Sequence, residues 1–152
     1  FRQDVTTTRY ETWADLIDYC RRSANPVGRL VLGIAGYRDD ALARQSDAVC
    51  TALQLVNFWQ DLERDLAKGR IYVPRESWGG AAEADLLRGA FTPEWRAALE
   101  TCAVRTRALF AEGRPVADGV SGRLRWELRG NVTETERRRS VSVTFPQSSG
   151  IW

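Results

Sequence analysis

One long stretch of this chain, from Asp39 or Asp40 to about Lys68, has the pattern of a single helix. An aspartate at either position is a favoured N-cap, and Gly69 is a favoured residue just beyond a helix end. The middle of the stretch is apolar on most of its sides, and such a helix belongs in the interior of a domain. Its apolar residues are Leu53, Leu55, Val56, Phe58, Trp59, Leu62 and Leu66. This stretch therefore predicts a central, buried helix.

Helical signals also occur on both sides of the central stretch. Apolar residues at helical spacing predict two helices that Asn25-Pro26 interrupts, because proline removes a backbone donor and clashes with the preceding turn. Thr92 and Pro93 form a favourable helix start as N-cap and first-turn residue. The predicted flanking helices span residues 13–23, 27–34, about 82–88, 92–112 and 116–128. Together they predict an all-α fold.

The end of the chain has a different character. From about residue 130 the sequence becomes charged and then polar and β-prone, and it leaves the helical pattern. The sequence therefore predicts a helical domain over residues 1–128 and an atypical tail over residues 129–152 that is loop or disordered. The first residues, Phe1-Arg2-Gln3-Asp4, contain no initiator Met and look like the middle of a helix, which predicts a fragment.

The composition excludes several classes of protein. The chain has 152 residues with a net charge of only +2, so its charge does not call for a nucleic-acid or membrane partner. It contains no His, which excludes a His-dependent catalytic triad and a His-ligated zinc site. Its three widely spaced Cys residues predict a reduced, cytoplasmic setting. The sequence shows no apolar run of transmembrane length and no signal peptide.

A polar stripe crosses the apolar middle of the predicted central helix. Gln54, Asn57, Asp61 and Asp65 follow one another at intervals of three, four and four residues, so they share one side of a helix. Two nearby carboxylates inside a protein repel each other and are costly to bury, and a magnesium ion would relieve both problems. The alternative is that both acids are solvated, or paired with cations such as Arg64, Lys68 and Arg70.

Two neighbouring runs also allow a functional and a structural interpretation. Arg70 follows the acids closely and suits bidentate binding of a diphosphate, although the end of a helix also favours an exposed arginine. Ala24 and Gly28 flank the predicted kink at Asn25-Pro26. Small residues at a kink leave room for a ligand, or they allow two helices to pack closely.

Taken together, these runs resemble the squalene/phytoene synthase family. The resemblance rests on residues 19–28, 54–65 and 69–74, and it extends over residues 1 to about 128. Two sequence motifs, Ser-Ala-Asn-Pro-Val-Gly and Asn-Phe-Trp-Gln-Asp, are most similar to those of the subgroup encoded in bacterial hopanoid operons. The start of the chain, residues 1–10, also resembles that subgroup.

The resemblance implies a fold and a reaction. The family fold is an isoprenoid synthase helical bundle around a central cavity, in which two Asp-rich motifs face each other and hold magnesium ions that bridge the substrate diphosphate. The subgroup converts presqualene diphosphate to hydroxysqualene and releases diphosphate. Matched residue by residue, the implied metal ligands are Asn57, Asp61 and Asp65, and the implied catalytic residues are Asp61, Asp65 and Tyr19. The implied substrate-binding residues are Gln54, Asn57, Arg70, Tyr72, Ala24, Val27 and Gly28.

The chain departs from the family pattern at both ends. The first Asp-rich motif would precede residue 1, and residues 130–152 do not resemble the closing helices. The resemblance implies a prenyl diphosphate substrate, partner enzymes of the squalene pathway and peripheral membrane association for an apolar product.

Other readings of the sequence remain open. A second reaction is head-to-head condensation of farnesyl diphosphate to presqualene diphosphate or squalene. An alternative of a different functional class is a non-catalytic helical assembly factor, or an inactive fragment, with the same fold. The retention of Asp61 and Asp65 counts against this alternative. A nucleic-acid binder is disfavoured, since the only arginine clusters lie at 21–22 and 137–139 and no recognised nucleic-acid motif surrounds them.

Overall fold

The computed structural model describes residues 6–137, with side chains through residue 130. Every regular element in this range is a helix, which confirms the predicted all-α class. The α-helices are α2 (Trp13–Ser23), α3 (Asn25–Ile34), α4 (Asp40–Gln60), α5 (Leu62–Ala67), α6 (Glu83–Leu87), α7 (Pro93–Gly113) and α8 (Gly122–Arg137). Two short 3-10 helices, η1 (Arg75–Ser77) and η2 (Arg114–Ala117), lie between them. The predictions for residues 1–5 and 138–152 fall outside the described residues.

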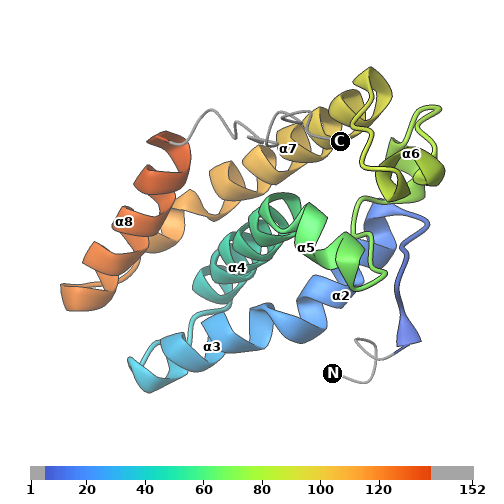
Figure 1. Cartoon of the computed structure of the whole chain (residues 1–152). Helices are drawn as coiled ribbons and strands as arrows, with labels where there is room; N and C mark the ends of the chain where they lie inside the picture. The colour runs from blue at the N-terminus through green and yellow to red at the C-terminus, as the bar shows by residue number, and fades with distance from the viewer. Residues whose placement is uncertain (1–5, 138–152) are drawn as a thin grey trace.

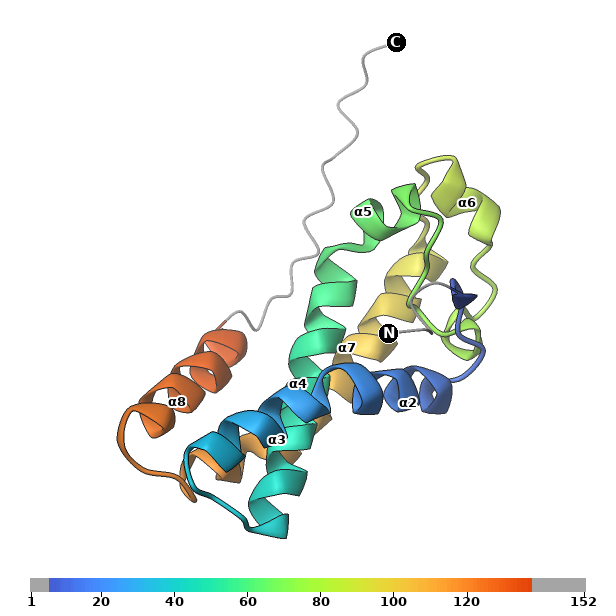
Figure 2. The ribbon, with the colours of Figure 1, turned by 90° about the horizontal axis from the view of Figure 1, so that it is seen from below.

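Helix α4 occupies the middle of the fold. Helices α2 and α3 follow each other along one side of α4, and α7 runs along the other side (Figure 1). Helix α8 packs on η2 at the far end of α7, as the second view also shows (Figure 2). The position of α4 between the other long helices confirms that it is the central helix.

The helix starts follow the capping signals of the sequence. The carboxylate of Asp39 accepts hydrogen bonds from the N–H groups of Ala41 and Leu42, so Asp39 rather than Asp40 is the N-cap of α4. The hydroxyl of Thr92 accepts from the N–H of Trp95 and caps α7. These local bonds explain why both starts were predictable from sequence.

The predicted continuous helix from position 39 or 40 to 68 is wrong in one respect. The structure divides it at Asp61, whose backbone angles of φ −94° and ψ 13° leave the helical range, so that α4 ends at Gln60 and α5 begins at Leu62. Gly69 follows α5 with φ +72°, a conformation that glycine adopts without strain, and ends the helical stretch as predicted. The bend does not alter the spacing of side chains along the chain, and therefore periodicity did not reveal it.

The prediction of a loop from residue 129 is wrong for residues 129–137, which continue α8 to Arg137. This part of the chain is rich in charged residues, and Glu and Arg favour an exposed helix as well as a solvated loop. Charge alone was therefore a poor guide to the backbone.

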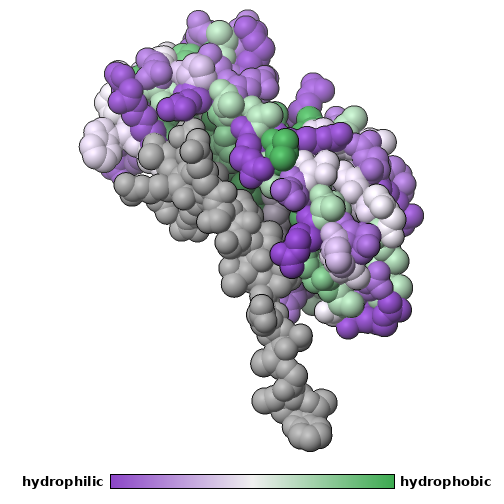
Figure 3. Space-filling model, turned by 90° about the horizontal axis from the view of Figure 1, so that it is seen from above, coloured by the Kyte–Doolittle hydropathy of each residue, from purple (hydrophilic) through white to green (hydrophobic). Residues whose placement is uncertain are grey.

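The core lies where α2, α4, α7 and the segment after α5 meet. Leu16, Leu55, Ile71 and Trp95 are fully buried in one continuous apolar cluster. The indole N–H of buried Trp59 donates to the Thr106 hydroxyl across 3.0 Å and ties α4 to α7. The face seen in Figure 3 is mostly hydrophilic with scattered apolar side chains, as is usual for a globular surface.

Candidate active site

The polar stripe stays aligned across the bend between α4 and α5. The N–H of Asp61 donates to the carbonyl of Asn57 across 2.8 Å, and the N–H of Asp65 donates to the carbonyl of Asp61 across 2.8 Å. Two successive bonds of helical type therefore stack these three residues one turn apart. The predicted common side of Asn57, Asp61 and Asp65 is confirmed.

The predicted burial of this stripe is only partly correct. Asn57 is exposed, the side chain of Asp61 is 42% exposed, and that of Asp65 is 14% exposed. Away from the stripe, Phe58 packs on Tyr19 of α2 and Trp59 bonds to Thr106 of α7, and both of these α4 residues are buried. The apolar pattern correctly indicated a central helix, but it did not show that the polar side of that helix faces outward.

The two acids already have cationic neighbours. Arg64 lies 3.3 Å from a carboxylate oxygen of Asp61, and the Lys68 ammonium lies 3.9 Å from one of Asp65. This is the ion pairing that the sequence left open as an alternative. Both cations are more than half exposed, and such pairs stabilise a fold little. They leave the carboxylates available to a stronger cation.

Asp65 is the more buried of the two acids. Burial raises the pKa of its carboxyl, and the charge of Asp61 acts in the same direction, while Lys68, Arg70 and Arg64 oppose them. A bound cation would favour the charged form. Among the side chains that the structure describes, no group of three or more His, Cys, Asp or Glu residues forms a metal-binding cluster. The donor set is thus two carboxylates and the Asn57 amide.

Arg70 and Tyr72 lie on the segment directly after α5. The N–H of Arg70 donates to the carbonyl of Asp65 across 2.8 Å, so this residue is joined to the end of the stripe. Tyr72 is buried, and its ring stacks on that of Phe58 with centroids 3.7 Å apart. Arg70 therefore lies next to the acids, and Tyr72 belongs to the apolar layer behind them.

Tyr19 joins the same aromatic layer. Its ring centroid lies 5.9 Å from that of Phe58 and 6.2 Å from that of Tyr72. Tyr10 completes the group, 5.8 Å from both Tyr19 and Tyr72. The structure thus brings the two candidate tyrosines together through Phe58 and Tyr10, which sequence reasoning missed as site residues. Nothing in the spacing of Tyr10 and Tyr72 along the chain pointed to their contact.

Of the remaining candidates, Gln54 lies in α4, and Ala24, Val27 and Gly28 lie around the start of α3. A side chain at Gly28 would place its Cβ 2.5 Å from both Cys50 Sγ and Ser46 Oγ of α4, so Gly28 permits close helix packing. Cys50 lies one helical turn before Gln54, on the side of α4 that carries Asn57. The stripe on α4 therefore continues toward α3.

Helix α3, which packs on α4, adds an exposed apolar face. Val27, next to Gly28, is 60% exposed, and Leu30, Val31 and Ile34 are exposed at helical spacing after it. Ala24, at the junction of α2 and α3, is half-buried. The candidate residues thus include a polar group, formed by the acids and Arg70, and exposed apolar residues on α3.

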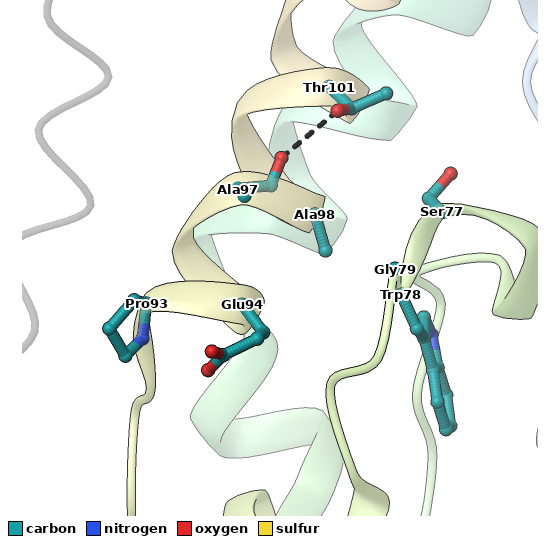
Figure 4. Close-up of a pocket in the computed structure, with 8 residues that line it drawn as sticks. All are labelled: Ser77, Trp78, Gly79, Pro93, Glu94, Ala97, Ala98 and Thr101. Carbon is teal, nitrogen blue, oxygen red and sulfur yellow. Dashed lines mark hydrogen bonds between the residues drawn. The ribbon is translucent and has the colours of Figure 1, made fainter.

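A separate pocket of about 360 Å³ lies between the loop after η1 and the first turns of α7 (Figure 4). None of the candidate residues lines it. Its lining residues are Ser77, Trp78, Gly79, Pro93, Glu94, Ala97, Ala98 and Thr101. The only charged group among them is Glu94, and a hydrogen bond from Thr92 holds the pKa of that carboxyl below its ordinary value. A pocket with an ionised carboxylate and without a cation does not suit a diphosphate.

The sequence model of the family described as squalene/phytoene synthase matches residues 1–138. The chain therefore belongs to the squalene/phytoene synthase family. The matched region extends about ten residues beyond position 128, where the resemblance expected from the sequence motifs ends.

Two similar proteins are bacterial hydroxysqualene synthases. A hydroxysqualene synthase of Zymomonas mobilis is 44% identical over 147 residues, which cover 95% of this chain and 48% of that relative. A hydroxysqualene synthase of Rhodopseudomonas palustris is 42% identical over 120 residues, which cover 77% of this chain and 41% of the relative. The chain thus spans about half the length, or less, of the curated relatives it matches.

The fold is also similar to a solved structure, squalene synthase HpnC from Alicyclobacillus acidocaldarius. The TM-score is 0.83 at 46% identity, over 91% of this chain and 56% of that chain. This likeness confirms the predicted isoprenoid synthase type of helical fold for the part of it that the chain spans. In the described residues, the helices lack the combination of length and hydrophobicity that a bilayer-spanning segment needs.

Proposed function

We propose that this chain is part of a magnesium-dependent isoprenoid enzyme that converts presqualene diphosphate to hydroxysqualene and releases diphosphate. Three relatives named hydroxysqualene synthase, at 39–44% identity, support this choice of reaction. The observation that carries the proposal is that the chain presents both an acidic stripe at the end of α4 and an exposed apolar face on α3, a helix that packs on α4. A prenyl diphosphate likewise combines an anionic head with a hydrocarbon tail.

The donor set at the polar end fits magnesium. Magnesium prefers oxygen ligands and keeps several waters, and one or two carboxylates with substrate phosphates are enough to hold it. Such ligands are supplied by the carboxylates of Asp61 and Asp65 and by the side-chain amide oxygen of Asn57, on residues that lie one helical turn apart. When bound, the metal would neutralise the negative charge that develops on the leaving diphosphate.

The other side chains have distinct roles in this proposal. Arg70, anchored beside Asp65, donates hydrogen bonds to diphosphate oxygens. Tyr19 and Tyr72 form the aromatic layer behind the polar end, where their rings stabilise a carbocation of the substrate and exclude water. The remaining candidates contact the substrate between the metal ligands and the prenyl chain: Gln54, Ala24, Val27 and Gly28.

A second candidate function is condensation of farnesyl diphosphate to presqualene diphosphate or squalene. The 46% identity to a protein described as squalene synthase favours it as the next reaction to test. Because both acids are present and their helical alignment is intact, a non-catalytic role on the same fold is less well supported.

The proposal extends to the surroundings of the enzyme. An apolar product is poorly soluble in water, so we infer peripheral contact with a membrane and transfer to other enzymes of squalene metabolism. The three free cysteines suit the reducing cytoplasm. Co-sedimentation of the chain with lipid vesicles in the presence of substrate tests the membrane part, and absence from the vesicle fraction would argue against it.

The binding test compares the parent with Asp61→Asn. The parent is expected to bind a non-hydrolysable farnesyl thiodiphosphate only when magnesium is present. The variant is expected to lose this magnesium-dependent binding, while its circular dichroism spectrum stays unchanged. Glu63→Gln is the matched control, because Glu63 is an exposed acid of α5 that lies off the stripe. Equal affinity of Asp61→Asn and the parent would refute the metal site. Product analysis with presqualene diphosphate and farnesyl diphosphate in parallel then separates the two reactions.

A further inference from the structure

The backbone around Arg70 is held by a residue that lies far away in the sequence. The N–H of Arg70 itself donates to the carbonyl of Asp65. On its preceding side, the carbonyl of Gly69 accepts a hydrogen bond from Arg9 Nη1 across 2.6 Å. The guanidinium of Arg9 therefore fixes the peptide group between Gly69 and Arg70.

The peptide group between Arg70 and Ile71 is held by the neighbouring residue Thr8. The N–H of Ile71 donates to the carbonyl of Thr8 across 3.0 Å. That carbonyl also accepts from Arg9 Nη1 across 2.7 Å. Both peptide groups that flank Arg70 are thus connected to residues 8 and 9, and Arg9 contacts both connections.

Arg9 is in turn anchored by a carboxylate. Its Nε lies 3.2 Å from Glu83 Oε1 at the start of α6, and its Nη2 contacts the same oxygen. The side chains are only 19% and 29% exposed, so this pair is better shielded than the pairs on the stripe. Arg75 lies 3.9 Å from the other oxygen of Glu83. The planar, forked guanidinium of Arg9 can bridge a carboxylate and two carbonyls together, which a lysine ammonium on its flexible stem cannot reproduce.

We propose that Arg9 is a positioning residue for the diphosphate-binding end of the site, held by Glu83 and acting through Arg70. It fixes the turn at residues 69–71, so that the Arg70 side chain stays beside Asp65 in the absence of ligand. A pre-positioned arginine binds an anion with less loss of conformational freedom than a mobile one. The inference rests on the proposed function, since it assigns Arg70 to the substrate diphosphate.

The test is a double-mutant cycle on the whole 152-residue chain. The probe is inorganic diphosphate with magnesium, and the affinity is measured by calorimetry for the parent, Arg9→Lys, Arg70→Gln and the double variant. Arg9→Lys is expected to weaken binding roughly tenfold, the lower end of the loss seen when a supporting residue is removed. In the Arg70→Gln background the same change is expected to have no further effect.

A purely structural role for Arg9 gives a different result. Arg9→Lys would then weaken binding equally in both backgrounds, or leave it unchanged, and either outcome overturns the proposal. Arg88→Lys is the matched control, because Arg88 also pairs with a carboxylate of α6, that of Asp85, but is largely exposed. It should not alter the affinity.

A second measurement separates this inference from the proposed function. Amide hydrogen exchange without ligand should be faster at Arg70 and Ile71 in Arg9→Lys than in the parent, with the amide of Asp61 unchanged. If the parent does not bind magnesium diphosphate, the proposed function fails, and the exchange rates alone decide on the positioning role. Unchanged exchange at both amides refutes it.

Discussion

The rings of Phe58 and Tyr72 are parallel within 4°, with their centroids 3.7 Å apart. The contact joins the last turn of α4 to the segment that follows α5. It lies behind the acidic stripe, because Phe58 is next to Asn57 but points to the buried side of the helix. The aromatic layer thus supports the position of the segment that carries Arg70.

We expect Phe58→Ala to lower the free energy of unfolding by roughly 3–5 kcal/mol, the usual cost of deleting a buried phenylalanine ring. The variant loses its contacts with Tyr72 and Tyr19 as well as apolar burial. Urea unfolding followed by circular dichroism measures the change. Phe91→Ala is the control, because Phe91 is only partly buried and should cost clearly less. Equal losses for both variants would contradict the importance of the layer.

Two glycines of α3 should respond in opposite ways to alanine. Gly28→Ala places a methyl group 2.5 Å from Cys50 Sγ and Ser46 Oγ, so we expect a loss of about 1–3 kcal/mol from overpacking. At Gly33 a Cβ meets nothing within 4 Å, so Gly33→Ala should raise stability by about 0.5–1 kcal/mol through helix propensity. Thermal unfolding of the two variants measures both effects. A stabilising Gly28→Ala would show that α3 and α4 do not pack as described.

The contribution of Glu83 to stability should depend on pH. The hydrogen bond from Arg9 holds the pKa of this carboxyl below its ordinary value of 4.5, so the folded state favours the charged form. That stabilisation is present above pH 4.5 and is lost as the pH falls through the folded-state pKa. The difference in unfolding free energy between the parent and Glu83→Gln should therefore be largest near neutral pH and shrink in acid. Glu63→Gln is the control, and a constant difference for Glu83→Gln would refute the ion pair.

The three thiols should differ in reactivity. Cys20 and Cys102 are fully buried, and burial raises their pKa values to about 12 and about 11. Cys50 is only partly buried, although burial also raises its pKa. Because the thiolate is the reactive form, we expect one slowly reacting thiol in the native chain and three after denaturation. A thiol assay with Ellman's reagent counts them, and Cys50→Ser should remove the native signal. A native signal that persists in this variant would mean that the core opens.

Local sequence signals determined the helices and the order of residues along them. The caps at Asp39 and Thr92 and the spacing of Asn57, Asp61 and Asp65 act within one or two turns, so the sequence alone was enough to predict them. The family was also recognisable from short runs of sequence. The bend at Asp61 and the continuation of α8 to Arg137 were missed, because both are compatible with the same local periodicity and charge.

Only the tertiary structure decided which side of the central helix faces outward and which distant residues support it. The apolar pattern of α4 placed it in the interior, but Asn57 is exposed because α2 and α7 pack on other sides of that helix. The contacts of Arg9 with Gly69 and Glu83 join residues 60 and 74 positions apart. The path of the loops and the packing of helices create such contacts, and no periodic pattern encodes them. The sequence by itself thus determined the family and the acidic stripe, and the fold determined how that stripe is supported.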